Sequence, residues 1–425
     1  MKTQLFLTLL LLVAASVGFC ADPIELTLPK GAKFINGTGQ IPIIGADFPA
    51  PGFTSQGYIE VSESAGPHVY FIGLNASEAT LTIRNSYKTA YNTPLVRITY
   101  ATRNKALGLT CKMEETEVKP WQYYVSDAMP LTVKGGDMLY LRTFIPLKEK
   151  TNIGCGIISG SNQRPDNRWP YGNITGSEDR TLDQEMEAEF KPTSDLLCVP
   201  FLMAGDGVRA DAPFVVVIGD SLTFQLSRDL DNGWFTRGFH ELPHANLAIG
   251  GDALSNMLDA EGNIRDRTNQ ARFAVLRYAT DVINFYGHND LGNGCTLDAM
   301  LNLEKKLCAR PEIAKARKWR LTLTPFIHNT KGVDMNKLTE ADQTPDKYSP
   351  VIVQFNKEMR ANYKLYGYNG VIDMGAGAAT GVDSMFWKSG LTQDGTHFER
   401  VAGFNAVWPE IQKVLPIISH VPVAK

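Results

Sequence analysis

The sequence predicts a mixed α/β protein in which a β-rich region precedes a parallel sheet covered by helices. Three observations lead to this prediction. Short segments of β-branched and aromatic residues, separated by Gly, Pro, Asn and Ser, fill residues 22–211. From residue 212 onward, apolar runs alternate with helical stretches, as in a parallel sheet with both faces buried. The chain has 425 residues, of which 44% are hydrophobic, and this length favours more than one domain.

The β-rich region is expected to form an antiparallel sheet or sandwich. Its candidate strands are short, bounded by turn-forming residues, and cover residues 58–61, 68–72, 80–83, 95–100 and 138–144. Residues 160–177 are polar and rich in Asn, Gly and Pro, so we expect a long surface loop there.

The α/β region is expected to span residues 212–418 and to contain a five-stranded parallel sheet. The strands are expected at residues 214–218, 245–249, 282–286, 320–324 and 371–374. Helices are expected at residues 222–230, 269–278, 297–306, 350–363 and 401–414. Because such sheets bind ligands at the carboxyl ends of their strands, the residues that follow each strand are candidates for a functional site.

Charge and hydropathy limit the partners and the location of the protein. Its 42 Lys and Arg against 45 Asp and Glu give a formal charge of -3, and no basic run could follow a phosphate backbone, so nucleic acid is not an expected partner. Residues 1–21 are expected to be an export signal, with Lys2 before the apolar run 5–17. Lipid attachment at Cys20 is an alternative, although Phe19 is larger than such signals favour. No later run is long enough for a membrane span. We therefore expect a secreted or periplasmic protein.

The cysteines suggest disulfides rather than a metal site. Removal of Cys20 with the signal leaves an odd number, namely Cys111, Cys155, Cys198, Cys295 and Cys308. A local bond from Cys295 to Cys308 is favoured, and one from Cys111 to Cys155 is the second choice. None of the cysteines has the spacing of a zinc ligand set. Three sequons could carry glycans in a host that attaches them, at Asn36, Asn75 and Asn173.

The first candidate for chemistry is Ser221, which follows the apolar strand 214–218 through Gly-Asp. A serine between the end of a strand and the start of a helix is exposed above the sheet, and the helix dipole there stabilises developing negative charge. This position suits a nucleophile. The alternative is that Asp220 or Ser221 serves only as the N-cap of the helix.

Two further segments follow expected strands and could donate hydrogen bonds to an oxyanion. Gly250 and Gly251 follow the second strand, where a glycine lets its backbone N–H approach a ligand, although such a pair can also be a plain turn. Asn289 follows the third strand within Gly-His-Asn-Asp, and its amide could donate, although Asn-Asp is also a common turn.

The fourth segment is Asp394-Gly-Thr-His397 near the carboxyl end. At this spacing the carboxylate can accept a hydrogen bond from one ring nitrogen while the other ring nitrogen faces the serine. Among the seven histidines, only His397 has such a partner in the sequence. Asp394 and His397 are therefore the expected orienting acid and general base.

The four segments occur in the order Ser, Gly, Asn, His, and in this order they resemble the motif blocks of the SGNH, or GDSL, hydrolases. The resemblance covers roughly residues 214–414. It implies a flavodoxin-like three-layer α/β/α sandwich and esterase chemistry without a metal or other cofactor. It also departs from the commonest pattern at two points, since Gly250 doubles the glycine of the second block and His288 fills the variable position of the third.

The resemblance assigns a role to each matching residue. Ser221 matches the nucleophile, and Asp394 and His397 match the acid and the base. The N–H groups of Ser221 and Gly251 and the side chain of Asn289 match the oxyanion hole. Residues 124–127 and 139–146 are loosely similar to the β-rich part of some secreted members. For that part, a carbohydrate-binding surface, a wall of the cleft and a stabilising cap are open alternatives.

We therefore expect a secreted serine ester hydrolase that removes a short acyl or acetyl group from a carbohydrate. The carbohydrate is suggested by export and by the loops around Trp169 and Trp387, whose rings could stack on sugars if they are not part of the core. An O-acyltransferase with the same triad is one alternative, and a non-catalytic carbohydrate-binding or adhesion protein is another. The sequence does not indicate the acyl length or the oligomeric state.

Overall fold

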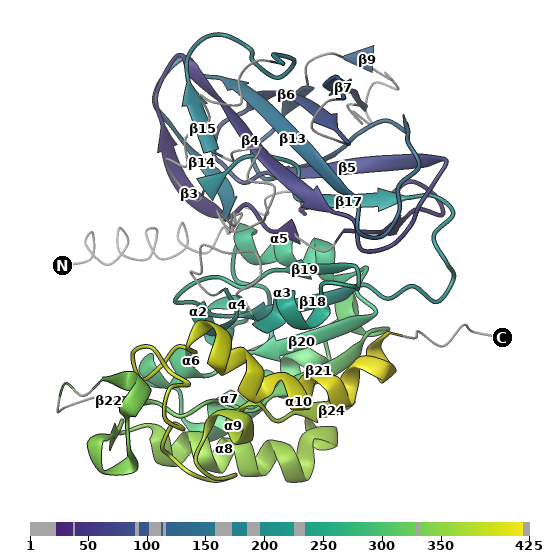
Figure 1. Ribbon diagram of the computed structural model, residues 1–425. Coiled ribbons are helices and arrows are strands. Elements are labelled where there is room, and N and C mark those ends of the chain that lie inside the picture. Colours follow the sequence, from purple (N-terminus) through teal and green to yellow (C-terminus); the bar gives the residue numbers. More distant parts are fainter. Residues whose placement is uncertain are drawn as a thin grey trace, which may run out of the picture.

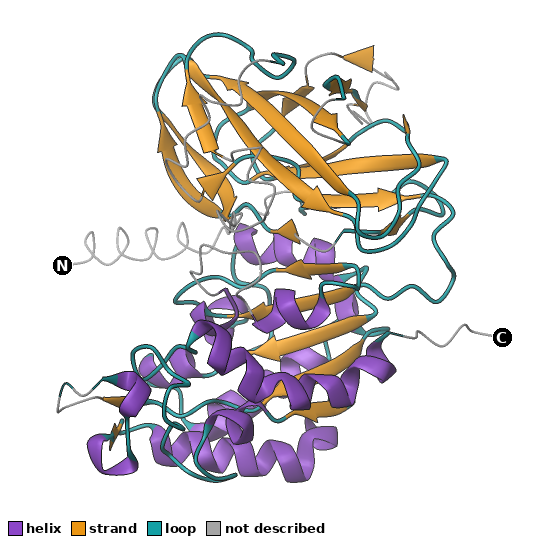
Figure 2. Cartoon of the chain, in the orientation of Figure 1, coloured by secondary structure: helices purple, strands orange, loops and turns teal. Residues whose placement is uncertain are grey.

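The structure is a computed structural model with a β-rich region at one end and an α/β region at the other (Figure 1, Figure 2). It describes residues 23–36, 39–89, 93–101, 112–113, 116–157, 172–184, 196–224, 234–328, 332 and 334–419. The expected export signal, Cys111 and Trp169 lie outside the described residues.

In the β-rich region the described strands pair antiparallel with one another, as the sequence predicts. One sheet has the order β10-β6-β13-β4-β15 with β7 beside β6, and a second has the order β1-β17-β5-β11 with β12 beside β5. Smaller sheets are β16-β14-β3 and β8-β9. The bounds are β1 Lys33–Phe34, β3 Ile44–Phe48, β4 Gly52–Glu60, β5 His68–Asn75, β6 Leu81–Lys88, β7 Val96–Ile98, β8 Tyr100–Ala101, β9 Lys112–Met113, β10 Thr116–Val118, β11 Gln122–Val125, β12 Met129–Pro130, β13 Met138–Pro146, β14 Thr151–Ile157, β15 Gly172–Thr175, β16 Leu196–Leu197 and β17 Leu202–Gly205.

The described end of one expected loop contains a strand. Of the predicted loop 160–177, residues 160–171 lie outside the described residues, and β15 (Gly172–Thr175) pairs with β4 in the remainder. The strand is anchored at Asn173, whose side-chain oxygen accepts a hydrogen bond from Ser55. Polar residues therefore extend the sheet here because the partner strand supplies polar contacts.

The α/β region contains a parallel sheet of six strands in the order β2-β19-β18-β20-β21-β24. The bounds are β2 Gly39–Gln40, β18 Val215–Gly219, β19 His244–Asn246, β20 Asp281–Phe285, β21 Arg317–Leu321 and β24 Gly370–Ile372. The last five are the strands that the sequence predicts, shifted by a few residues. The expected number of five is wrong because β2, from the first part of the chain, pairs in parallel with β19.

The order of these five strands places the site. Numbered along the chain they lie as 2-1-3-4-5, the order of flavodoxin-like sheets, so the strand order reverses at β18. Ligands bind beyond the carboxyl ends of strands at such a point. Ser221 follows β18 after Asp220, and Asn289 lies shortly beyond the end of its neighbour β20.

Alternate residues of β18 point to opposite faces of the sheet, and each face is covered by helices. Val216 and Ile218 belong to a core with α4, α5 and α7, whereas Val215 and Val217 belong to one with α3, α8 and α10. The helix bounds are α2 Ser221–Phe224, α3 Trp234–Phe239, α4 Leu254–Met257, α5 Arg267–Leu276, α6 His288–Gly292, α7 Leu297–Cys308, α8 Ser349–Asn362, α9 Met374–Ala378 and α10 Arg400–Ile418. A strand that is apolar on both faces therefore forms the middle of three layers.

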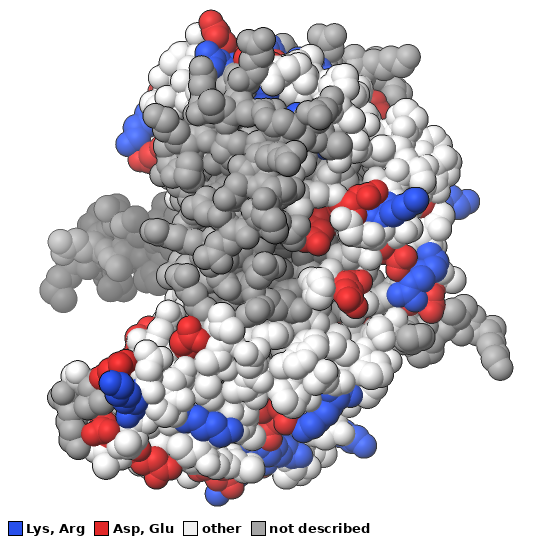
Figure 3. Space-filling model, in the orientation of Figure 1, with Lys and Arg blue, Asp and Glu red and all other residues white. Residues whose placement is uncertain are grey.

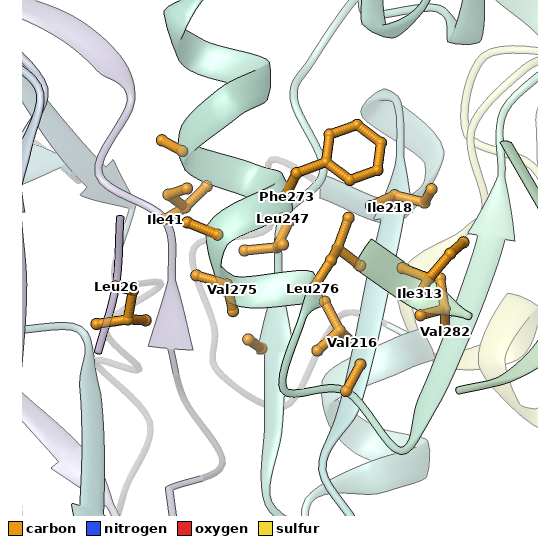
Figure 4. Close-up of a cluster of buried hydrophobic side chains, with 14 of the residues drawn as sticks. Leu26, Ile41, Val216, Ile218, Leu247, Phe273, Val275, Leu276, Val282 and Ile313 are labelled. Atoms are coloured by element: carbon orange, nitrogen blue, oxygen red, sulfur yellow. The ribbon is translucent and has the colours of Figure 1, made fainter. Parts of the chain in front are cut away.

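The β-rich region packs against α5 through a shared core. Leu26 and Ile41 from the first part of the chain lie in the same apolar cluster as Leu247 and Val275 (Figure 4). Tyr123 in β11 donates a buried hydrogen bond to the carbonyl of Ala271 in α5, at 2.9 Å. Of the three roles considered for this region, these contacts favour a stabilising cap. The boundary between residues 211 and 212 stays a prediction.

The expected disulfide between Cys295 and Cys308 is wrong, because both thiols are free, as are those of Cys155 and Cys198.

The side chains of Asn36 and Asn75 are buried and hydrogen-bonded to backbone groups, so two of the three sequons have no accessible amide. None of the described helices is long and apolar enough to cross a membrane. On the face drawn in Figure 3, described basic and acidic side chains are interspersed.

Candidate active site

The hydroxyl of Ser221 lies within hydrogen-bonding distance of a histidine. Ser221 is the first residue of α2 and follows the buried strand β18, so the end of the strand holds its backbone while its side chain stays partly exposed. Its Oγ lies 2.9 Å from Nε2 of His397, although the two residues are far apart in the sequence. This contact places a hydroxyl proton beside a possible proton acceptor.

His397 is oriented by Asp394 within one tight turn. Nδ1 of His397 lies 2.7 Å from Oδ2 of Asp394. The other carboxylate oxygen accepts from the backbone N–H groups of Thr396 and His397, at 2.9 and 2.7 Å. The carboxylate therefore holds both the ring and the backbone of the turn. Nδ1 carries the proton in this arrangement, which leaves Nε2 free to accept one from Ser221.

The turn requires glycine at position 395. Gly395 has a φ of +93°, and a Cβ atom there would lie 2.4 Å from the carbonyl oxygen of Ile327. The Gly395 carbonyl accepts hydrogen bonds from the Ile327 N–H and from the indole of Trp387, at 3.1 and 3.0 Å. These contacts fix the turn that carries His397.

Trp387 is part of this support and not a sugar-stacking surface. Its side chain is fully buried, and its backbone is held by Gln343 through two hydrogen bonds of 2.8 and 2.9 Å. The suggestion that Trp387 stacks on a sugar is therefore wrong.

The charges around His397 favour its protonated form. The hydrogen bond to Asp394 raises the pKa of His397 above its usual value, partial burial opposes this, and the charges of Asp394 and Asp220 add to it. Burial alone would raise the pKa of Asp394, but hydrogen bonds from His397 and from backbone N–H groups outweigh burial and lower it. Asp394 therefore stays ionised and can stabilise an imidazolium.

Asp220 caps the helix, so the N-cap interpretation holds for this residue and not for Ser221. Its Oδ1 accepts from the Leu222 N–H at 3.0 Å. The side chain is fully buried, and Oδ2 has no hydrogen-bond partner in the part of the chain that the structure describes. Burial is the largest cause that raises the pKa of Asp220 to about 7. The carboxylates of Asp290 and Asp252 contribute to this rise, and the Leu222 N–H and the charge of His397 oppose it. Sequence reasoning missed this group of acids because its members follow three different strands.

Asn289 is joined to the segment that contains Gly251. Nδ2 of Asn289 donates to the carbonyl oxygen of Asp252 at 2.9 Å. Because a side-chain amide has two N–H donors, this bond orients the amide and leaves the second donor for a ligand. The next residue, Asp290, accepts from the N–H groups of Leu254 and Ser255, at 3.0 and 2.9 Å. The second and third segments thus form one connected unit.

A buried network holds Asp252 in place behind this unit. Oδ2 of Asp252 lies 2.7 Å from Nη1 of Arg272 and accepts from the Tyr286 hydroxyl at 2.6 Å. Arg272 also donates to Tyr286. The side chains of Arg272 and Tyr286 are fully buried, so the charge of Arg272 is paired with that of Asp252 in the interior. Neither residue was predicted, because Asp252, Arg272 and Tyr286 come from separate segments that meet only in the folded chain.

Gly251 is exposed and has a φ of +76°, a conformation that favours glycine. It directly precedes the anchored Asp252, which places its backbone beside the Asn289 unit. Its role as an oxyanion donor stays a prediction, and so does its choice over Gly250.

His288, at the variable position of the third block, is buried. It is 6% exposed, its Nε2 donates to the Thr324 carbonyl at 2.9 Å, and its ring lies against Phe285 and Phe326. Burial lowers the pKa of His288 to about 4, so the ring is neutral near pH 7. The role of His288 is therefore structural.

Among the described residues there is no group of three His, Cys, Asp or Glu side chains that could hold a metal ion.

The comparisons with known proteins find likenesses only among solved structures. No family model and no curated protein matches the chain. A GDSL-like lipase from Bacteroides thetaiotaomicron is 14% identical, with 48% of this chain and 88% of that chain covered and a TM-score of 0.35. A phospholipase A1 from Streptomyces albidoflavus is 14% identical, with 48% and 99% covered and a TM-score of 0.30. An alpha/beta hydrolase from the metagenome of Lake Arreo is 15% identical, with 49% and 98% covered and a TM-score of 0.33. The GDSL name of the first is that of the family which the four motifs resemble.

Proposed function

We propose that the protein is a serine hydrolase of carboxylic esters that works through an acyl-enzyme on Ser221. The observation that carries this proposal is the chain of contacts from Ser221 Oγ to His397 Nε2 at 2.9 Å and from His397 Nδ1 to Asp394 at 2.7 Å. This is the arrangement in which a neutral imidazole can take the proton of a serine hydroxyl while a carboxylate stabilises the resulting cation.

The reaction proceeds in two halves. His397 removes the proton from Ser221 as Oγ attacks the ester carbonyl, and the oxyanion accepts from the Ser221 N–H, the Gly251 N–H and the free donor of Asn289. The intermediate collapses to an acyl-enzyme, and the alcohol leaves with the proton from His397. Water then gives its proton to His397 and attacks the acyl group. Collapse of the second intermediate returns that proton to Ser221 and releases the carboxylic acid.

A short acyl or acetyl group on a carbohydrate is the proposed substrate. Burial of Trp387 removes one of the two rings considered for sugar stacking, so the carbohydrate now rests on the expected export of the chain. Activity on p-nitrophenyl esters of increasing chain length and on acetylated polysaccharides measures the acyl length and the alcohol directly. EDTA is expected to leave the rate unchanged, since no step uses a metal.

Labelling with a fluorophosphonate tests the proposal. The wild-type protein should react, and mass spectrometry should find the adduct on the peptide that contains Ser221. Ser221→Ala should lose both the label and ester hydrolysis at an unchanged melting temperature, because a partly exposed hydroxyl contributes little packing. Ser389→Ala is the matched control, since that hydroxyl bonds the Asn336 carbonyl in an exposed loop. Wild-type turnover in Ser221→Ala would contradict the assignment.

The labelling and a measurement of the reaction products separate the two alternatives from the proposal. An acyltransferase would form more acylated sugar than free acid when a sugar acceptor is present in excess, whereas a hydrolase would release free acid at the same rate with and without the acceptor. A binding protein would remain unlabelled by the fluorophosphonate.

A further inference from the structure

Cys155 and Cys198 lie opposite each other in neighbouring antiparallel strands. In the pairing of β14 with β16, Gly156 faces Leu197 and Ile157 faces Leu196. One step further in the same register, Cys155 faces Cys198. This pair could not be chosen from the sequence, because the register that joins the two cysteines depends on the folded sheet.

The two thiols also lie in one buried cluster, and a hydrogen bond with the Cys155 side chain is among the causes that raise the pKa of the Cys198 thiol. Both side chains are buried, Cys155 fully and Cys198 to 6% exposure. Their other sulfur contacts are with the nearby carbonyls of Ile153 and Gly154, at 3.6 and 3.9 Å.

The backbone geometry suits a cross-strand bond. The N–H of Cys198 donates to the Ser55 hydroxyl at 3.2 Å and so is not used in the ladder towards Cys155. This is the arrangement of a non-hydrogen-bonded pair, in which opposite Cα atoms lie about 4.5 Å apart and the side chains are close. That separation falls within the range of about 4.4–6.8 Å found between the Cα atoms of disulfide-bonded cysteines.

We infer that Cys155 and Cys198 form a disulfide bond when the chain folds in an oxidising compartment. The oxidant is a disulfide donor, either a low-molecular-weight disulfide or a thiol oxidoreductase. One cysteine thiolate attacks the donor and forms a mixed disulfide, and the other cysteine then displaces the second donor thiol. Two protein thiols are thereby oxidised to one disulfide, and one donor disulfide is reduced to two thiols.

The bond forms during folding and not in the finished protein. Burial raises the pKa of the Cys198 thiol well above its usual value, and the hydrogen bond with Cys155 adds to this, so Cys198 has little reactive thiolate in the folded chain. The enclosed segment, residues 155–198, joins β14 to β16 and includes β15, which pairs with β4. Closing this segment restricts the unfolded chain, so the bond should stabilise the β-rich region.

The experiment is to refold the mature chain in a buffer of reduced and oxidised glutathione, alkylate the remaining thiols and map tryptic peptides without reduction. Trypsin separates the relevant cysteines, because Lys112 lies between Cys111 and Cys155 and Arg168 lies between Cys155 and Cys198. We expect one linked pair of peptides that contains Cys155 and Cys198, lighter by two hydrogen atoms than the sum of the two thiol peptides. Reduction should lower the melting temperature by roughly 5 °C or more.

Two variants act as controls. The double variant Cys155→Ala/Cys198→Ala should lack the linked peptides, and its melting temperature should no longer depend on reductant. The double variant Cys295→Ser/Cys308→Ser should keep both the link and the dependence. Recovery of Cys155 and Cys198 as alkylated thiols from the refolded wild type, or of Cys155 linked to Cys111, would overturn the inference. Neither readout depends on ester hydrolysis.

Discussion

The two regions of the molecule treat polar side chains in opposite ways. In the α/β region, Ser221 and Asn289 follow the ends of parallel strands, remain partly exposed and are oriented by other side chains or loops. In the β-rich region, Asn36 and Asn75 are fully buried and hydrogen-bonded to backbone groups of neighbouring segments. The partly exposed polar residues after the parallel strands are therefore the candidates for chemistry, whereas the buried ones among the antiparallel strands give structural support.

The largest effect expected after loss of the nucleophile is that of Asn289→Ala. Its amide donates to an oxygen that becomes fully charged only in the transition state, so kcat should fall about 100- to 1000-fold while KM changes little. Steady-state kinetics on a p-nitrophenyl ester measures both constants. A kcat near that of the wild type would mean that the donors lie elsewhere.

His288→Ala is the neighbouring control. Because His288 is buried against aromatic rings and donates to Thr324, its loss should reduce the free energy of unfolding by about 2 kcal/mol or more. The folded fraction should keep most of its kcat. If this variant lost turnover without losing stability, the ring would take part in the chemistry and the structural interpretation would be wrong.

A smaller effect on rate is expected from Trp387→Phe. This change removes the indole N–H that holds the Gly395 carbonyl, and so loosens the turn that carries His397. Displacement of the base should lower kcat/KM by roughly 10- to 100-fold. Trp319→Phe is the matched control, since that buried indole donates to Asp281 at the first residue of β20, at the opposite end of the strand from Asn289. Trp319→Phe should lower the melting temperature without changing kcat/KM. Equal losses of kcat/KM in both variants would contradict a local role for Trp387.

The pH profile tests the charges around the base. Only neutral His397 can accept a proton, so kcat/KM should increase with pH and reach half of its maximum above the usual histidine pKa of 6.5. Asp394→Asn removes the carboxylate that stabilises the imidazolium. The pKa of His397 should then decrease, which moves this limb to lower pH while the maximum rate also falls. A limb that stayed in place would assign the titration to another group, such as Asp220.

Much of the α/β region could be predicted because buried apolar runs, of which β18 is the clearest, alternate with helical stretches along its sequence. The acid and the base of the triad could also be predicted, since Asp394 and His397 lie three residues apart in one turn. The sixth strand could not be predicted, because β2 is a Gly-Gln pair with no apolar pattern and is defined only by its pairing with β19. The support from Arg272 and Trp387 and the proximity of Cys155 to Cys198 also arise only when distant segments meet.

The smallest expected effect lies at the contact between the two regions. Tyr123→Phe removes one buried hydrogen bond, from β11 to the Ala271 carbonyl in α5, and leaves the ring in the shared core. Because a neutral hydrogen bond contributes about 1 kcal/mol, chemical denaturation should show a decrease of that size in the free energy of unfolding. The value of kcat should stay unchanged, since the substitution leaves the buried Arg272–Asp252 pair, which joins α5 to the site, in place. A loss of kcat with unchanged stability would show that the β-rich region acts on the chemistry and is more than a stabilising cap.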